Sequence, residues 1–152
     1  MNVLITGAGG QVGQAFAAIA GRYPQHRFFF FNRLQLDIAD EAAIADALKE
    51  TAAHCLVNCA AYTGVDKAET DFDAAVAINS TAAAALAKAC NAQGAKLVHI
   101  STDYVFDGNG TAPYKESDAV QPVNAYGRSK LMGEEAAIKA NKEAVIIRTS
   151  WV

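Results

Sequence analysis

A tyrosine and a lysine four residues apart, Tyr126 and Lys130, are the side chains of this sequence best suited to moving a proton. On a helix, residues four apart lie on the same face, one turn from each other. An ammonium at that distance can favour the tyrosinate and keep the phenol ready to pass a proton. Since many helical surfaces carry such a pair, the spacing alone also fits a solvated helix face.

A glycine-rich turn near the start of the chain favours the catalytic interpretation. Residues 6–13 follow a short apolar strand expected over residues 2–6 and lead into a helical pattern. The glycines could make a tight turn, admit a pyrophosphate to the helix N-terminus and let the helix pack closely on the strand. The turn therefore predicts a dinucleotide site, with a ligand-free strand-to-helix turn as the alternative. Its expected contacts are Gly7, Gly10, Gln11, Val12 and Gly13.

Strands and helices alternate along the rest of the chain. Four consecutive phenylalanines at 28–31 predict a strand buried on both faces. Asp40 is expected to cap a helix, and residues 103–123 to form a long surface excursion. The remaining expected elements are strands at 56–58, 96–101 and 144–148 and helices at 72–92 and 124–140. This alternation predicts the α/β class: a doubly wound parallel sheet, a Rossmann-type dinucleotide-binding domain over residues 1–152.

Composition narrows the class of protein further. The 152 residues are 52% apolar, enough for one two-faced core, and the net charge is only −3. Scattered basic residues argue against a nucleic-acid partner, and no apolar run is long enough to span a membrane or act as a secretion signal. We therefore expect a cytoplasmic protein. Three cysteines and three histidines without metal-ligand spacing predict buried thiols and no metal site.

Residues 32–38 bear on the choice of cofactor. About twenty residues after the glycine turn, where an NAD-selective fold places an acid, the chain has Asn32 and Arg33. Arg33 could pair with a 2′-phosphate, which favours NADPH and leaves NADH possible, or it could be a surface charge. Asp37 and Ile38 could border the adenine or begin the next turn.

Several blocks of sequence together resemble the extended short-chain dehydrogenase/reductase superfamily, and within it the dTDP-4-dehydrorhamnose reductase family. The similarity runs the whole chain, and Gly64 stands where that family usually has alanine. The blocks at 62–69 and 101–108 are specific to this branch. The matching residues are 6–13, 58–63, 65–69, 101–108 and 126–130.

The resemblance implies a role for each residue at its matching position. Tyr126 would be the general acid for a C4 carbonyl, Lys130 would hold the nicotinamide ribose and tune Tyr126, and Thr102 would donate to the same oxygen. Two donors aligned on a developing alkoxide stabilise the transition state more than the ground state. Further cofactor contacts would be Ala60, Ala61, Tyr62 and Asn79, and substrate contacts Thr102, Asp103, Tyr104 and Trp151, with packing as the alternative for several of them.

The same resemblance implies a reaction and leaves two alternatives open. The reaction is the NAD(P)H-dependent reduction of dTDP-4-dehydro-6-deoxy-L-mannose to dTDP-L-rhamnose, acting on a dTDP-sugar, with a possible homodimer in a longer parent. Dehydration is disfavoured because Tyr104 replaces an acid. The alternatives are a non-catalytic regulatory subunit like that of methionine adenosyltransferase and a sugar-nucleotide epimerase. The resemblance also implies a second, smaller substrate lobe, so we expect residues 1–152 to be a fragment of weak or no activity.

Overall fold

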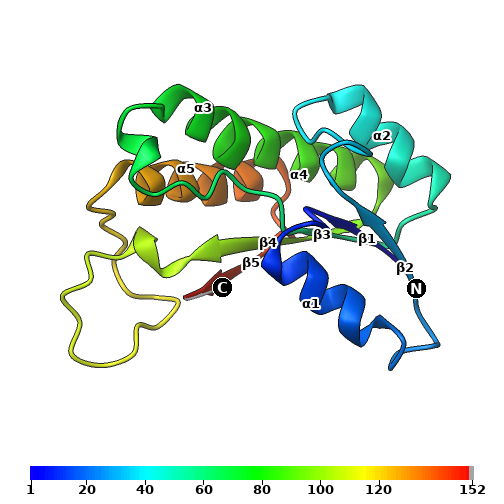
Figure 1. Ribbon diagram of the computed structural model, residues 1–152, viewed down its shortest axis with the longest axis horizontal. Helices are drawn as coiled ribbons and strands as arrows, with labels where there is room; N and C mark the ends of the chain where they lie inside the picture. The colour runs from blue at the N-terminus through cyan, green and yellow to red at the C-terminus, as the bar shows by residue number, and fades with distance from the viewer. Residues whose placement is uncertain (151–152) are drawn as a thin grey trace.

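The computed structural model describes residues 1–150 and is built on a five-stranded parallel sheet with the order β2-β1-β3-β4-β5 (Figure 1). This architecture confirms the predicted α/β class and the parallel sheet. The strands are β1 (Asn2–Thr6), β2 (Arg27–Phe31), β3 (Cys55–Asn58), β4 (Lys96–Thr102) and β5 (Val145–Thr149).

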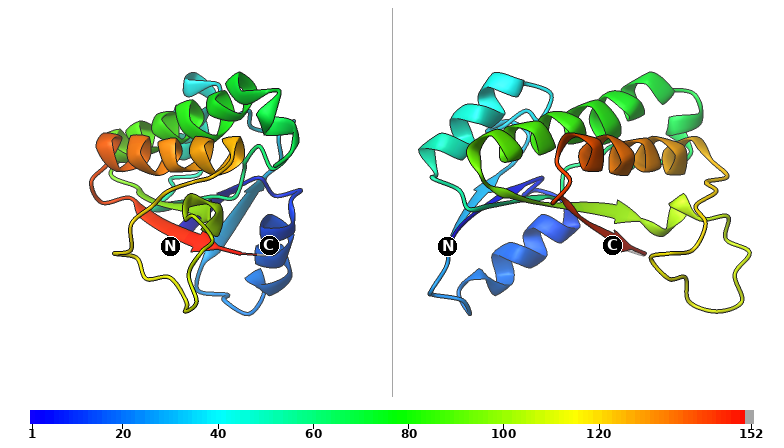
Figure 2. Two further views of the ribbon diagram at one scale, coloured as in Figure 1. Left: turned by 90° about the vertical axis from the view of Figure 1, so that its left-hand side faces the viewer. Right: turned by 180° about the vertical axis from the view of Figure 1, so that it is seen from behind.

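Helices cover the two faces of the sheet unequally. One face carries α1 (Gln11–Ala20), and the other carries the four remaining α-helices, as the two further views also show (Figure 2). Those four are α2 (Glu41–Glu50), α3 (Phe72–Val76), α4 (Ala82–Gln93) and α5 (Ala125–Ala140). None of the helices within residues 1–150 has the length and apolar character needed to cross a membrane.

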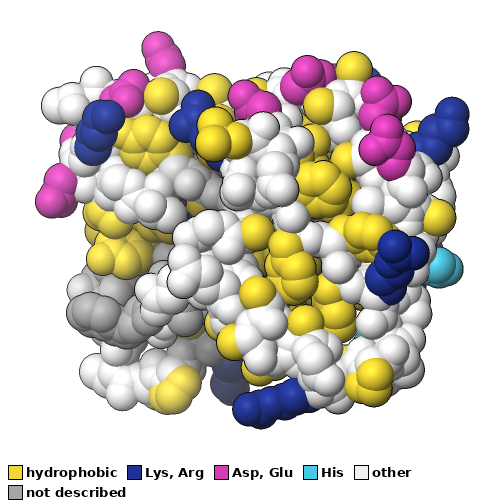
Figure 3. Space-filling view, turned by 45° about the vertical axis from the view of Figure 1, so that its right-hand side comes forward, with side chains coloured by type: hydrophobic (Ala, Val, Ile, Leu, Met, Phe, Trp, Pro, Cys, Tyr) yellow, Lys and Arg dark blue, Asp and Glu magenta, His cyan; other side chains and the backbone are white. Residues whose placement is uncertain are grey.

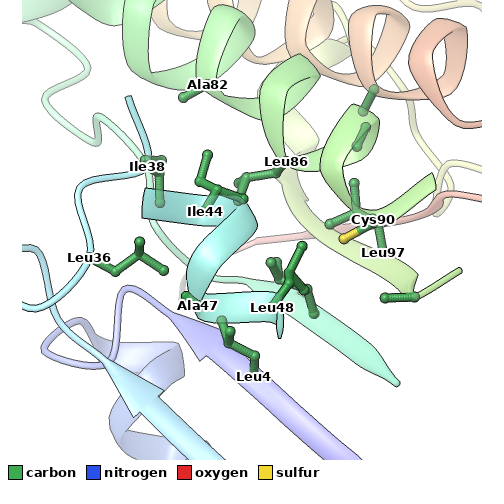
Figure 4. Close-up of a cluster of buried hydrophobic side chains, with 14 residues drawn as sticks. Leu4, Leu36, Ile38, Ile44, Ala47, Leu48, Ala82, Leu86, Cys90 and Leu97 are labelled. Atoms are coloured by element: carbon green, nitrogen blue, oxygen red, sulfur yellow. The ribbon is translucent and has the colours of Figure 1, made fainter. Parts of the chain in front are cut away.

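The larger core lies between the sheet and helices α2 and α4. Leu4 and Leu97 from the strands meet Ile44 of α2 and Leu86 of α4, and all four side chains are completely buried (Figure 4). Burying a side chain of this size contributes roughly 2 kcal/mol, so the contact fixes both helices on the sheet. The outer surface of this helical layer carries many of the acidic side chains in the view of Figure 3.

The phenylalanine-rich strand differs from the prediction. β2 is an edge strand that pairs only with β1, and Phe28 to Phe31 are each partly exposed rather than buried on both faces. Phe28 and Phe30 stack on each other, with ring centroids 6.2 Å apart, and pack against Val3 and Ile5 under α1. The prediction of burial was wrong because an apolar run shows that a strand is buried somewhere, but not whether a second strand lies beside it.

Local capping sets three of the helix ends. The Asp40 carboxylate accepts from the backbone N–H groups of Ala42 and Ala43 at 2.9 and 3.0 Å, which confirms the predicted cap of α2. Asn124 caps α5 in the same way, accepting from Gly127 at 2.7 Å. Gly94 ends α4 with a left-handed φ of 68°.

The alanine-rich segment predicted as one helix is helical throughout but is not one α-helix. A π-helical turn, η2 (Ala77–Thr81), separates α3 from α4. The wider turn buries Asn79 and Ser80, and Gly133 of α5 packs directly against the Asn79 carbonyl. Such turns occur often at functional sites because they redirect a side chain without ending the helix. Two short 3₁₀ turns, η1 (Lys67–Glu69) and η3 (Asp103–Val105), lie in segments predicted as loops.

Candidate functional site

A cavity of about 1060 Å³ opens along the edge of the sheet where the strands end. Strand order reverses between β1 and β3, and open parallel sheets bind ligands at such a point. The structure thus brings residues from five separate sequence segments into one cavity. The predicted site residues that line it are Gly7, Gly10, Gln11, Val12, Asn32, Arg33, Asp37, Ile38, Ala60, Ala61, Thr102, Asp103, Tyr104, Tyr126 and Lys130.

Two glycines of the turn, Gly7 and Gly13, have no room for a side chain. Gly7 adopts a left-handed φ of 67°, and a Cβ there would lie 2.5 Å from the backbone nitrogen of Ala60. A Cβ on Gly13 would lie 2.5 Å from the Gly7 carbonyl oxygen. Gly13 is buried and lies behind the cavity rather than in it, so its role is the close packing of α1 on the turn.

The N-terminus of α1 is suited to an anion. Gly10 occupies the N-cap without any side chain to bond the first N–H groups, and the first turn contains no acidic residue. Unsatisfied N–H groups and the helix dipole together favour a negative group there. This cradle therefore fits the pyrophosphate of a dinucleotide, which the sequence predicted.

The adenosine end of the cavity is formed by the turn after β2. The Asn32 side-chain oxygen accepts from the N–H groups of Leu34 and Gln35 at 2.9 and 3.1 Å, so Asn32 shapes this turn. Arg33 is exposed at the rim and forms no salt bridge within residues 1–150. Ile38 is 5% exposed and presents an apolar wall. A free cation next to an apolar wall is a suitable environment for a phosphorylated adenosine.

Thr102 and Tyr126 meet at the opposite end of the cavity. Thr102 ends β4, and its hydroxyl donates to Asp103 at 3.1 Å and accepts from the Tyr104 N–H at 3.2 Å. The rings of Tyr104 and Tyr126 pack edge to face, with centroids 5.6 Å apart. Burial raises the pKa of Tyr126, and its interaction with Thr102 partly offsets that rise. The phenol is thus kept protonated and can donate.

Lys130 points away from Tyr126, the partner that the sequence predicted for it. It is 1% exposed, and its Nζ donates to the Ile100 carbonyl at 2.7 Å and lies 3.5 Å from His99 Nε2. Burial lowers the pKa of Lys130 to about 8, against the attraction of Glu134. The expected lowering of the Tyr126 pKa by Lys130 is therefore not seen, because desolvation of the phenol outweighs other effects and the ammonium faces the sheet.

Charged groups outside the cavity hold α5 in place. The Glu69 carboxylate accepts from the Ala125 N–H at 2.7 Å, at the start of α5, and lies 3.8 Å from Arg128. Farther along α5, the buried Glu134 accepts from Ser101 at 2.5 Å and pairs with Arg148 at 2.7 Å. These contacts tie both turns that flank Lys130 to the neighbouring elements.

Besides Gly13, two predicted cofactor residues, Tyr62 and Asn79, lie outside the cavity. The Asn79 side chain accepts from the Tyr62 N–H at 2.8 Å and donates to the Tyr62 carbonyl at 3.0 Å and to Ser129 at 2.9 Å. The Tyr62 hydroxyl donates to Asp71 at 3.3 Å. Asn79 and Tyr62 therefore brace the loop after β3, whose neighbours Ala60 and Ala61 do line the cavity. Trp151 lies outside the described residues.

Sequence reasoning did not identify several residues of this region. Thr63, Val65, Ile100, Asp107, Val123 and Asn124 also line the cavity. The position of Thr63 just after β3 could have indicated it. Asn58 and His99 are completely buried beside the cavity. The sequence could have indicated them, because each is a polar residue inside an otherwise apolar strand.

The three cysteines of the described residues are free thiols whose burial disfavours the thiolate form. Cys90 is buried as expected, whereas Cys55 and Cys59 are only partly buried. Burial raises the pKa of Cys59 to about 11 and that of Cys90 to about 12, so these thiols stay protonated. Within residues 1–150, no group of His, Cys, Asp and Glu side chains is placed to hold a metal ion.

Proteins of known sequence and structure resemble this chain closely. The dTDP-4-dehydrorhamnose reductase of Mycolicibacterium smegmatis is 45% identical over 154 residues, which cover 99% of this chain and 46% of that protein. The crystal structure of dTDP-4-dehydrorhamnose reductase from Bacillus anthracis in complex with NADP superposes with a TM-score of 0.93 at 39% identity, covering 99% of this chain and 53% of that one. The Clostridium acetobutylicum reductase structure gives 0.91 at 39% identity, covering 99% and 54%.

The chain spans about half the length of these relatives. The family model described as the RmlD substrate binding domain matches residues 1–152, from the glycine turn through the Tyr126 helix. The chain belongs to the RmlD substrate binding domain family.

Proposed function

We propose that the protein to which this chain belongs is an NADPH-dependent reductase that converts the C4 ketone of a dTDP-4-dehydro-6-deoxy sugar to an alcohol, forming dTDP-L-rhamnose. The observation that carries this proposal is one cavity with a phosphate cradle at one end and Thr102, Tyr126 and Lys130 at the other. The relatives named as dTDP-4-dehydrorhamnose reductases support the choice of sugar.

The residues present fit a nicotinamide dinucleotide. The glycine turn allows the backbone approach that a pyrophosphate needs, and Arg33, which forms no salt bridge in the part of the chain that the structure describes, suits a 2′-phosphate. Ala60 and Ala61 line the cavity with small side chains beside the turn, which suits a ribose. When bound, the cofactor would supply the hydride.

The chain's own residues would manage the proton and the developing charge. Hydride addition to a ketone creates an alkoxide, and the buried Tyr126 phenol is held protonated to neutralise it. Thr102, fixed by its bonds to Asp103 and the Tyr104 N–H, would orient the same oxygen. The Tyr104 side chain at the rim, 44% exposed, would contact the sugar nucleotide.

Arg33 provides a direct test of the cofactor assignment. Arg33→Asp should lower the affinity for NADPH at least tenfold and shift the preference towards NADH, because an acid repels the 2′-phosphate and can bond a ribose hydroxyl. Calorimetry with both cofactors on the 152-residue chain measures the ratio, with Arg22→Asp as a control outside the cavity. An unchanged ratio would remove Arg33 from the site.

We also propose that efficient turnover needs a second, substrate-gripping lobe, since the relatives are about twice as long as this chain. Binding energy from the nucleotide part of the substrate positions the ketone against Tyr126. The 152-residue chain alone should therefore bind NADPH yet reduce the dehydro sugar very slowly. Full activity from this chain would show that no second lobe is required.

One assay separates the reductase from a binding subunit and from an epimerase. The full-length protein is mixed with the dTDP-4-dehydro sugar and NADPH, and cofactor oxidation is followed by absorbance. A reductase consumes one NADPH per alcohol formed, whereas an epimerase returns its cofactor unchanged and a regulatory subunit consumes none. The M. smegmatis reductase serves as the positive control.

A further inference from the structure

A row of buried polar side chains runs through the sheet to the catalytic lysine. Thr6 of β1, Asn58 of β3, His99 of β4 and Lys130 of α5 are each about 1% exposed. Each of the four contacts the next one in the row. Buried polar groups are costly unless their hydrogen bonds are satisfied, so the direction of each bond in this row is constrained.

The orientation of the Asn58 amide is fixed by its neighbours. Its Oδ1 accepts from the Ala60 backbone N–H at 3.2 Å and from the Thr6 hydroxyl at 2.6 Å. A backbone N–H can only donate, so the atom that faces it must be the amide oxygen. The amide nitrogen therefore faces His99 Nδ1, at 2.9 Å, and donates to it.

This bond determines which nitrogen of His99 carries the proton. The ring is buried, which lowers the pKa of His99 to about 3 and keeps the imidazole neutral. Because Nδ1 accepts from Asn58, the single ring proton must be on Nε2. Nε2 lies 3.5 Å from Lys130 Nζ, so a ring N–H points at the lysine.

A ring N–H directed at Lys130 opposes its charged form. An ammonium has three donors and no lone pair, whereas the neutral amine can accept one bond from Nε2 while still donating to the Ile100 carbonyl. Glu134 of α5 acts the other way, but its carboxylate is engaged by Arg148 of β5 and by Ser101. Tyr126 is the remaining titratable group one turn away on the same helix.

We propose that His99, with its tautomer set by Asn58, is a positioning residue that balances Lys130 between its ammonium and amine forms. This role rests on the proposed function. Tyr126 gives its phenolic proton to the new alkoxide, and the tyrosinate that remains must regain a proton from solvent before the next cycle. Because Lys130 lies one turn farther along α5, its ammonium form favours the tyrosinate, whereas its amine form favours return of the proton to the phenol.

Nuclear magnetic resonance tests the proposal on the unaltered 152-residue chain, without substrate or turnover. Long-range proton–nitrogen correlations of the imidazole should show His99 with its proton on Nε2, and the ¹³Cε signal of Lys130 should titrate with a midpoint near 8. A proton on Nδ1, or a Lys130 midpoint at the value of exposed lysines, would overturn it. Neither result depends on the reductase assay, and an inactive protein would leave the tautomer unaffected.

Two isosteric variants test whether the His99 tautomer and the protonation of Lys130 change together. In Asn58→Asp the new carboxylate can keep the bonds from Ala60 and Thr6 and accept a proton from Nδ1, so the Nε2 lone pair should turn to Lys130. The Lys130 midpoint should then rise by about one pH unit or more, equivalent to tenfold in affinity for the proton. Glu134→Gln, the matched control, should lower the midpoint without changing the tautomer. A tautomer switch that leaves the Lys130 midpoint in place would also contradict the proposal, and if the variants fail to fold, the native spectra decide.

Discussion

Burial shifts the pKa values of two side chains on one face of α5, Tyr126 and Lys130, in opposite directions. Tyr126 keeps its proton because burial raises its pKa, whereas burial lowers the pKa of Lys130 towards neutrality. Desolvation disfavours the charged form of either group, so the same physical cause produces an acid that retains its proton and a base that can release one. That combination suits a ketone reduction, in which the phenol donates its proton once per cycle and must then be protonated again.

The proton donor can be tested by removing one hydroxyl. Tyr126→Phe in the full-length protein should lower kcat by about 100-fold or more, since a general acid is lost, while NADPH affinity and stability change little. Steady-state kinetics and calorimetry measure the two effects. Tyr23→Phe, at an exposed tyrosine outside the cavity, is the control. A variant with near-parental kcat, when hydride transfer limits the rate, would make Tyr126 a structural residue.

Burial of Lys130 should make the free energy of unfolding depend on pH. The pKa of Lys130 is about 8 in the folded chain and about 10.5 when unfolded, so between these values the unfolded chain binds more protons. The free energy of unfolding should therefore rise with pH over this window, by up to about 3 kcal/mol from this group. Urea unfolding of Lys130→Met should lack this rise, and the surface variant Lys88→Met should retain it. The same slope in Lys130→Met as in the parent would place the titration elsewhere.

At the scale of elements, the first strand, the glycine turn and α1 form the cofactor cradle by close backbone packing. Gly13→Ala would normally favour a helix, but its Cβ would lie 2.5 Å from the Gly7 carbonyl oxygen, where only backbone could move. We expect a loss of about 2 kcal/mol or more in stability and a loss of NADPH binding.

The control for Gly13→Ala lies at the other end of the same helix. Gly21→Ala meets nothing within 4 Å at a φ of −62° and should be neutral or slightly stabilising. Thermal unfolding and calorimetry of the two variants should therefore diverge. Equal behaviour of the pair would show that the contact between α1 and the turn is not required.

The sequence predicted the elements of the fold well where the pattern is local. The apolar run of β1, the Asp40 cap and the Gly94 helix end follow from neighbouring residues, and all are present. The edge position of β2 was missed because strand order depends on contacts between distant segments. The π-turn at Asn79 was missed because the alanine-rich sequence fits an uninterrupted helix equally well.

At the site too, residues in local sequence patterns could be predicted, whereas residues that matter through contacts between distant segments could not. Glycine spacing and the Tyr126–Lys130 pair indicated where the cavity would form, because parallel strands end at one edge. Asn58 and His99 escaped notice because their importance comes from facing each other, although they are 41 residues apart in sequence, and from the contact of His99 with Lys130 of α5. No local pattern carries that information.

The whole molecule presents a sheet that is well covered on one side and less so on the other. Ile146 of β5 packs against the core under α2 and α4, so its neighbours Val145 and Ile147 point to the opposite face, where they are 48% and 42% exposed. The chain also spans about half the length of its relatives. These two facts agree with the proposal that turnover depends on more of the protein than residues 1–152, although the cofactor cradle lies entirely within them.

Isotope transfer tests directly whether this cavity directs hydride from NADPH to the C4 carbon of a dTDP-sugar. The full-length protein is given the dehydro sugar and NADPH that carries deuterium at the transferable position of the nicotinamide, and the product is analysed by mass spectrometry and NMR. We expect one deuterium, on C4 of the product, for each NADPH consumed. A product without deuterium, or label that remains entirely in the cofactor, would contradict it.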